Sequence, residues 1–137
     1  MSQITENQFT ERFAALILNG KELPKKLQDR HILFISSILK LEPGRHYTEI
    51  ELNDELRSWT ARFGSNSGLD HVTLRRFLVD EKYLTRDLAG GTYELAADAL
   101  PFTFDSSLRD LDLDKLVGDA RQARELKKQQ FLNRAPA

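Results

Sequence analysis

Three segments of the chain begin with the same arrangement of residues, and this arrangement limits the possible folds more than any other feature. An apolar residue comes first, a residue able to cap a helix comes next, and an amphipathic run follows. The capping residues are Thr5, Thr48 and Asp70. Such a side chain accepts a hydrogen bond from a free backbone N–H of the first helical turn, and the preceding apolar residue packs against the helix. The sequence therefore predicts three helices with defined starting points.

Two of these starts are complete capping boxes. Gln8 stands three residues after Thr5, and Glu51 stands three residues after Thr48, so each can bond back to the backbone of its cap. The apolar pairs expected beside the caps are Ile4 with Phe9, Tyr47 with Leu52 and Leu69 with Leu74. We expect the helices to run to Asn19-Gly20, to about Phe63 and to about Lys82.

A further helix is predicted from about Pro24 or Asp29 to Leu41. Apolar residues cover most of its circumference, which indicates a central, buried helix. These residues are Leu27, Ile32, Leu33, Phe34, Ile35, Ile38, Leu39 and Leu41.

Two short runs, "YLTRD" and "TYELA", flank the turn "LAGG" and predict a β-hairpin. With a brief extended segment at His46-Tyr47, the order is helix, strand, helix, turn, helix, hairpin. This is the order of a winged helix, in which the helix after Asp70 takes the recognition position and Ala89 to Gly91 form the tip of the wing.

We therefore predict an α+β fold that is mostly α. A winged-helix-like domain over residues 23–96 follows an N-terminal helix over residues 1–22. Residues 97–137 form a linker and a C-terminal amphipathic helix, with a short strand at Phe102 to Phe104. Leu113, Leu116, Val117, Ala120, Ala123 and Leu126 lie on one side of that helix.

Composition and motifs exclude several classes of function. The chain has no cysteine and a net charge of −1, so thiolate sites are absent and overall charge gives no argument for nucleic acid. The start resembles no signal peptide, and the longest apolar cluster, "ILFISSIL", is too short to cross a bilayer. We expect a cytoplasmic protein without membrane contact. His31, His46 and His71 lie in separate predicted elements, so we predict no catalytic site, no metal site and no cofactor.

Arg75 and Arg76 are the strongest candidates for a binding site. Leu74, Phe77 and Leu78 share one narrow sector of their helix and should face the core. The two arginines flank a second, weaker apolar stripe. That stripe consists of Val72, Val79 and Tyr83.

Two interpretations of this second face remain open. In one, it meets a nucleic-acid groove, because the planar guanidinium can grip guanine edges or phosphates. In the other, the arginines join helix to helix, with Arg76 paired to Asp80 four residues on and with acidic partners on the preceding helix. We expect Arg75 to point outward and Arg76 to be structural. We read Asn53 as a structural amide.

Other basic residues could add contacts to phosphates, which give affinity without sequence preference. The full set of nucleic-acid-binding candidates is Lys25, Lys26, Arg30, His71, Arg75, Arg76, Lys82 and Arg86. The basic residues of the C-terminal helix are further candidates. For each lysine, the alternative is an ordinary solvated surface charge.

The stretches "LEPGRHYTEIELN", "DHVTLRRFLVDEKYLTRD" and "GTYEL" resemble the bacterial domain-of-unknown-function family numbered twenty-eighty-seven. The resemblance covers roughly Leu23 to Leu95. Members occur alone or attached to transcription-regulator domains, so the resemblance implies a nucleic-acid-binding role. It is carried by Gly44, Arg45, Tyr47, Thr48, Glu49, Glu51, Asn53, Asp70, Leu74, Arg75, Arg76, Leu78, Val79, Asp80, Leu84, Arg86 and Tyr93.

The sequence thus favours a DNA-binding protein resembling transcription regulators, with duplex DNA as its partner. The alternative is a protein-interaction or dimerisation module on the same scaffold. In that case the Val72, Val79 and Tyr83 stripe would hold a partner, or the C-terminal helix would form a homodimer.

Overall fold

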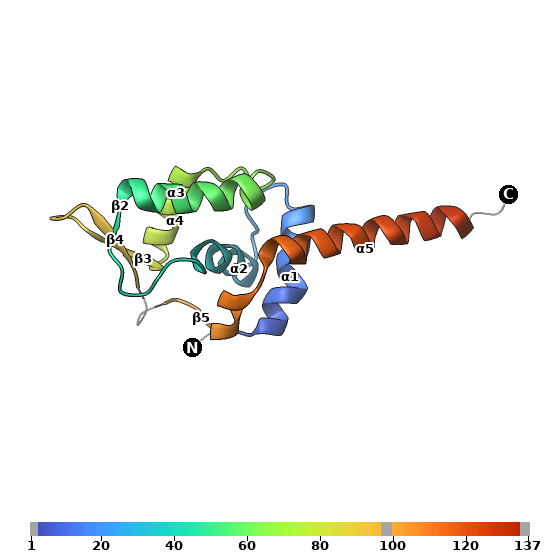
Figure 1. Cartoon of the computed structure of the whole chain (residues 1–137), viewed down its shortest axis with the longest axis horizontal. Helices are drawn as coiled ribbons and strands as arrows, with labels where there is room; N and C mark the ends of the chain where they lie inside the picture. Colours follow the sequence, from blue (N-terminus) through green and yellow to red (C-terminus); the bar gives the residue numbers. More distant parts are fainter. Residues whose placement is uncertain (1–2, 97–99, 135–137) are drawn as a thin grey trace.

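The computed structural model describes residues 3–96 and 100–134. The fold is α+β and mostly helical, as expected (Figure 1). Its helices are α1 (Glu6–Asn19), α2 (Leu27–Ile38), α3 (Glu49–Trp59), α4 (His71–Asp80) and α5 (Leu113–Arg134), with a π-helical turn at Thr60–Gly64 and a 3-10 turn at Ser106–Asp110. Its strands are β1 (Gln3–Ile4), β2 (Tyr47–Thr48), β3 (Leu84–Asp87), β4 (Thr92–Leu95) and β5 (Thr103–Phe104).

All three predicted caps are confirmed. The Thr5 and Thr48 side chains accept hydrogen bonds from the backbone of Gln8 and Glu51, and both capping boxes are complete. The Asp70 carboxylate accepts a hydrogen bond from the Thr73 backbone N–H at 2.7 Å. The apolar residues beside the caps are buried, which sets the direction from which the chain enters each helix.

α2 is the central helix, as predicted. Every residue from His31 to Leu39 is buried, and the other elements surround α2 in Figure 1. Two details of the prediction are wrong. Leu27 is 61% exposed because it begins α2, ahead of the part that the other elements cover. α2 also ends at Ile38 rather than Leu41, and Arg109 donates hydrogen bonds to the Leu39 and Leu41 carbonyls just beyond that end.

The predicted hairpin is confirmed, and the extended segment before α3 joins it. β4 pairs antiparallel with both β3 and β2, so the sheet order is β2-β4-β3. Tyr47 lies opposite Tyr93, and Tyr93 lies opposite Arg86. Directly opposed residues point to the same face of a sheet, so these three side chains form one row across it.

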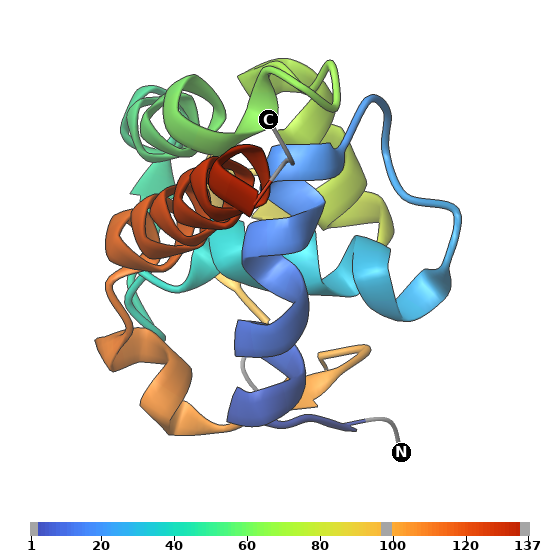
Figure 2. The ribbon, with the colours of Figure 1, turned by 90° about the vertical axis from the view of Figure 1, so that its right-hand side faces the viewer.

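The helices and strands outside α2–α4 and the β2-β4-β3 sheet pack against the same core. α1 contacts both α2 and α5, and α1 and the start of α5 lie side by side in Figure 2. The predicted strand near Phe104 is confirmed, because β5 pairs in parallel with β1. Leu113 and Val117 are buried, so the first part of the apolar side of α5 is covered by this chain itself.

Tyr83 does not belong to an exposed stripe on α4, and that part of the prediction is wrong. Its side chain is fully buried. Lys82 adopts a left-handed conformation with φ of 70°, and the Tyr83 N–H bonds to the Leu78 carbonyl at 2.9 Å. This hydrogen bond and the left-handed Lys82 end α4 in the manner of a Schellman motif. Helical spacing stops at Lys82, and the chain turns Tyr83 inward.

Tyr83 meets His31 inside the protein. The Tyr83 hydroxyl and His31 Nδ1 are hydrogen-bonded at 2.6 Å, and the imidazole stacks on Phe102 with ring centroids 4.2 Å apart. Burial lowers the pKa of His31, which Glu81 partly offsets. Burial raises the pKa of the Tyr83 phenol. The folded protein therefore favours the neutral form of both groups.

We expect this histidine to make the fold sensitive to acid. A lowered pKa in the folded state means that the unfolded chain binds the proton more readily, so stability falls as pH drops below about 6.5, the unperturbed value for histidine. The midpoint of urea unfolding should be lower at pH 5.5 than at pH 7.5. His31→Gln should remove part of this difference. An NMR titration that gives His31 an ordinary or raised pKa would contradict the prediction.

Candidate functional site

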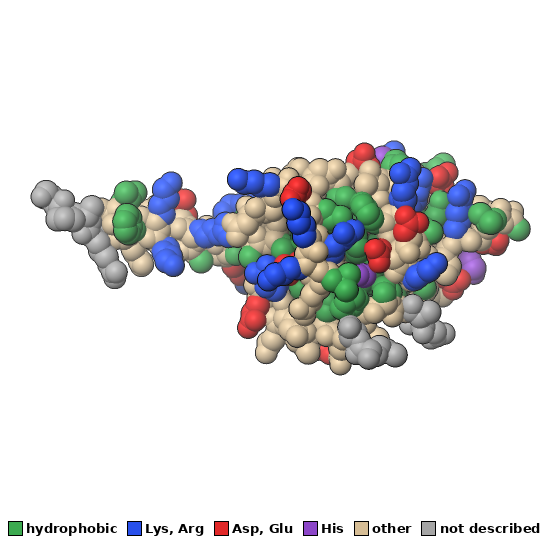
Figure 3. Space-filling model, turned by 180° about the vertical axis from the view of Figure 1, so that it is seen from behind, with side chains coloured by type: hydrophobic (Ala, Val, Ile, Leu, Met, Phe, Trp, Pro, Cys, Tyr) green, Lys and Arg blue, Asp and Glu red, His purple; other side chains and the backbone are tan. Residues whose placement is uncertain are grey.

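α4 has an inner face and an outer face. Leu74 and Leu78 are fully buried, and Phe77 stacks on Phe34 of α2 with centroids 5.7 Å apart. On the opposite side, Val72 is 42% exposed and Arg76 is exposed. α4 lies behind α3 in Figure 1 and so faces the viewer in Figure 3, where Lys and Arg side chains are spread over the surface with acidic ones between them.

A shallow groove of about 220 Å³ lies between this outer face and the hairpin. We call it the arginine groove. Three of its seven lining side chains are arginines, and one is a carboxylate. Its lining consists of Val72, Arg75, Arg76, Val79 and Asp80 from α4, Arg86 from β3 and Tyr93 from β4.

Arg75 is fixed in one wall of the groove. It donates a hydrogen bond to Asn53 Oδ1 at 2.5 Å and pairs with Glu49 at 3.2 Å. Its side chain is only 18% exposed. The expectation that Arg75 points freely outward is therefore wrong, and the expectation that Asn53 is structural agrees with this bond.

Arg76, rather than Arg75, is the arginine that points outward. It is exposed, and within residues 3–96 and 100–134 no carboxylate lies within ion-pair distance of it. The expected pair with Asp80 is absent among these residues. The two roles are exchanged because α3 crosses α4 beside Arg75. Glu49 and Asn53 are four residues apart on α3 and so share one face, and that spacing could have indicated a joint partner.

Arg86 lies on the other side of the groove, across the sheet from Tyr93. Its guanidinium lies over the Tyr93 ring at 5.6 Å, and that of Arg75 lies at 5.8 Å from the same ring. Tyr93 is 4% exposed, so it supports both arginines without offering a surface for stacking. Arg86 itself is exposed, and its side chain forms no hydrogen bond or ion pair within the described part of the chain.

The other predicted binding residues do not line the groove. His71 and Lys82 lie at the two ends of α4. Arg30 lies over Phe77 at 5.7 Å, on the inner side of α4. Lys25 and Lys26 are exposed just before α2. The structure thus brings three of the eight candidates together, Arg75, Arg76 and Arg86, and leaves five apart.

A second hollow of about 350 Å³ lies among the end of α2, α3 and the start of α5. Two pairs of its polar side chains are bonded to each other. Arg62 pairs with Asp114 at 2.7 Å, and the Trp59 indole N–H donates to Ser36 at 2.9 Å. Within residues 3–96 and 100–134, no cluster of histidine and acidic side chains could hold a metal ion. No helix in the same ranges is long and apolar enough to cross a membrane.

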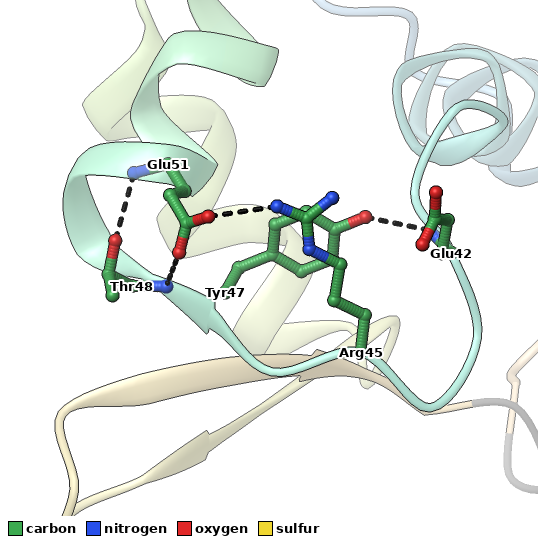
Figure 4. Close-up of polar contacts among 5 residues, drawn as sticks. All are labelled: Glu42, Arg45, Tyr47, Thr48 and Glu51. Carbon is green, nitrogen blue, oxygen red and sulfur yellow. Dashed lines mark hydrogen bonds and ion pairs between the residues drawn. The ribbon is translucent and has the colours of Figure 1, made fainter.

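Many polar residues that carry the family resemblance hold the fold together. Figure 4 shows one such cluster at the connection from α2 to α3. Arg45 bonds to Glu51 at 2.8 Å and covers the Tyr47 ring at 4.6 Å, and the Tyr47 hydroxyl accepts the Glu42 backbone N–H at 2.8 Å. Hydrogen bonds from the Thr48 backbone and from Arg45 lower the pKa of Glu51. These contacts give Arg45, Tyr47 and Glu51 a structural role at this connection.

Three charged residues of the same pattern differ from this cluster. Among the described residues, the side chains of Arg76, Asp80 and Arg86 form no hydrogen bond and no ion pair. All three line the arginine groove. The arginine groove is therefore one place where the fold leaves charged groups available to another molecule.

Comparison with known proteins agrees with the resemblance. No curated protein and no solved structure matches the chain. The family described as "Uncharacterized protein conserved in bacteria (DUF2087)" matches residues 21–95, which span α2 to β4 and include the whole arginine groove. The chain therefore belongs to the DUF2087 family of bacterial proteins.

Proposed function

We propose that this protein binds nucleic acid, with duplex DNA as the partner and the arginine groove as the contact surface. The observation that carries the proposal is the state of the three arginines. Arg75 is held by Asn53 and Glu49, whereas Arg76 and Arg86 beside it are exposed and have no carboxylate partner among the described residues. Guanidinium groups without protein partners suit phosphates and base edges.

The arrangement of elements supports a winged-helix interpretation. The order α2, β2, α3, α4, β3, β4 is the one expected of that fold. In it, α4 would be the recognition helix and would enter a groove of the duplex, with Arg76 toward the bases or phosphates. The hairpin tip at Ala89 to Gly91 would contact the backbone beside it. The activity proposed is binding without catalysis, in a role like that of transcription regulators.

Two further features of the surface agree with this proposal. Asp80 is the only carboxylate in the groove lining, and a carboxylate on a recognition helix can accept a hydrogen bond from a cytosine amino group. Lys82 is exposed and holds a left-handed conformation that usually favours glycine. A lysine at this strained position is consistent with a use for its charge.

Replacing Arg76 and Arg86 together with alanine is expected to weaken duplex binding by about tenfold or more at low salt. The reason is that a lost base contact costs roughly 1–3 kcal/mol, and a lost phosphate contact weakens binding and lowers the salt slope by about one unit. The plot of log affinity against log salt should become shallower by about two units, because each lost phosphate contact removes about 0.9. Fluorescence anisotropy with a labelled duplex of mixed sequence at several salt concentrations measures both quantities.

A matched control is Lys40→Ala with Arg57→Ala. Both residues are exposed and lie outside the groove, so this variant loses the same charge elsewhere and should bind like the unchanged protein. The proposal is wrong if the unchanged protein shows no salt-sensitive affinity for duplex. It is also wrong in its site if the groove variant and the control variant bind equally well.

A further inference from the structure

The second half of α5 extends away from the rest of the protein. Leu113 and Val117 are buried and Leu116 and Ala120 are half-buried, but every residue from 121 to 133 is exposed. Figure 1 shows this half as a single helix directed away from the other elements. We call residues 121–133 the arm.

The arm is strongly basic, although the whole chain carries a net charge of −1. It has four cationic residues, Arg121, Arg124, Lys127 and Lys128, and one acidic residue, Glu125, which gives +3. Within the described ranges, none of these side chains forms an ion pair. In Figure 3, Lys and Arg side chains appear on both edges of the arm as well as on the globular part.

The helix dipole accounts for only part of this charge. Positive side chains are favoured at the C-terminal end of a helix, but the effect falls off within the last turn. α5 runs to Arg134, so Arg121 and Arg124 lie well before its last turn. Among the described residues, these side chains form no hydrogen bond and no ion pair, so their charge is available to a partner outside the chain.

The arm has no continuous apolar seam that a second helix could cover. Its large apolar residues are Leu126, Phe131 and Leu132, which are 54%, 74% and 61% exposed. At about 100° per residue, Leu126 and Phe131 point about 140° apart. Two arms side by side would also bring like charges together, which is unfavourable. Neither a helical pair nor an amphipathic helix on a membrane suits this surface.

We infer that the arm binds the phosphate backbone of nucleic acid. A polar helix that leaves its domain is marginally stable alone in water, and a polyanion would stabilise it by neutralising its charges. The arm is about 20 Å long at 1.5 Å per residue, and duplex DNA presents one charge about every 1.7 Å. The inference takes its partner, duplex DNA, from the proposed function. It uses a different surface, so the arm and the arginine groove can each be disproved as a contact surface without the other.

The test neutralises the arm and leaves the groove intact. Replacing Arg124, Lys127 and Lys128 with glutamine removes three charges from exposed side chains, so the fold should be unaffected. The plot of log duplex affinity against log salt should become shallower by about two to three units, because each lost phosphate contact removes about 0.9. The control replaces Lys40, Arg57 and Lys115 with glutamine, and its slope should not change. Circular dichroism checks that both variants keep their helix content.

The outcomes separate the two proposals. If the arm variant loses slope while the groove variant does not, the arm inference holds and the groove assignment fails. If only the groove variant loses slope, the arm inference is overturned. It is also overturned if the arm variant keeps its duplex affinity but no longer forms a dimer in light scattering, or no longer binds vesicles of anionic lipid.

Discussion

Replacing Phe34 with alanine is expected to lower the free energy of unfolding by about 3–5 kcal/mol. Phe34 is fully buried at the centre of α2. The centroid of its ring lies 5.7 Å from that of Phe77 in α4, 5.7 Å from that of His31 and 6.2 Å from that of Tyr83. The substitution would leave a cavity where α2, α4 and the turn after α4 meet. Urea unfolding followed by circular dichroism at pH 7.5 measures the loss.

Ile50→Ala is the matched control for this prediction. Ile50 is also a large apolar residue within a helix, but it is 74% exposed. Its replacement should change the stability by less than about 0.5 kcal/mol. If the two variants lose similar amounts, α2 is not the centre of the core as described.

Arg75→Ala is expected to lower the free energy of unfolding by about 1.5–3 kcal/mol, the usual contribution of a hydrogen bond that involves a charged group. Arg75 is mostly buried, and its removal leaves Asn53 without the hydrogen bond and Tyr93 without one of its covering guanidinium groups. Arg76→Ala should change stability by less than about 0.5 kcal/mol, as expected of a surface side chain. Urea unfolding of both variants under the same conditions makes the comparison.

A double-mutant cycle sharpens this comparison. If Arg75 acts through Asn53, then Asn53→Ala combined with Arg75→Ala should cost less than the sum of the two single changes. Equal losses in the free energy of unfolding for the Arg75 and Arg76 variants would contradict the assigned roles, in which Arg75 forms a wall of the groove and Arg76 is left to bind a ligand. The same variants, tested for duplex binding, would then show whether Arg75 acts directly or by shaping the groove.

The alternative function, a protein-interaction or dimerisation module, loses part of its expected surface. Tyr83 is buried, so the stripe on α4 is reduced to Val72 and Val79. The buried start of α5 is likewise covered by α1. A homodimer through α5 stays a prediction, and light scattering of the unchanged protein tests it.

Local features of the fold could be predicted because they depend on neighbours in the chain. The caps at Thr5, Thr48 and Asp70 need only residues within one helical turn, and the hairpin needs only its turn and two short runs. The apolar residues of α2 indicated a buried helix for the same reason. Helical spacing also predicted which side of α4 carries Leu74 and Leu78.

Errors arose where the outcome depends on distant parts of the chain or on one backbone angle. The left-handed conformation of Lys82 turns Tyr83 inward, and lysine at that position gives little sign of it. Periodicity placed Arg75 and Arg76 as near equals on one face. Only the crossing of α3 over α4 shows which of them meets Asn53 and Glu49.

The sequence by itself thus determined the helices, the hairpin, the central position of α2 and the family. The tertiary structure alone decided which charges are satisfied inside the protein and which are left for a partner. The physical reason is that a guanidinium group has the same chemistry wherever it stands. Whether it holds the fold or binds a ligand depends on whether packing brings a carboxylate or amide within about 3 Å of it.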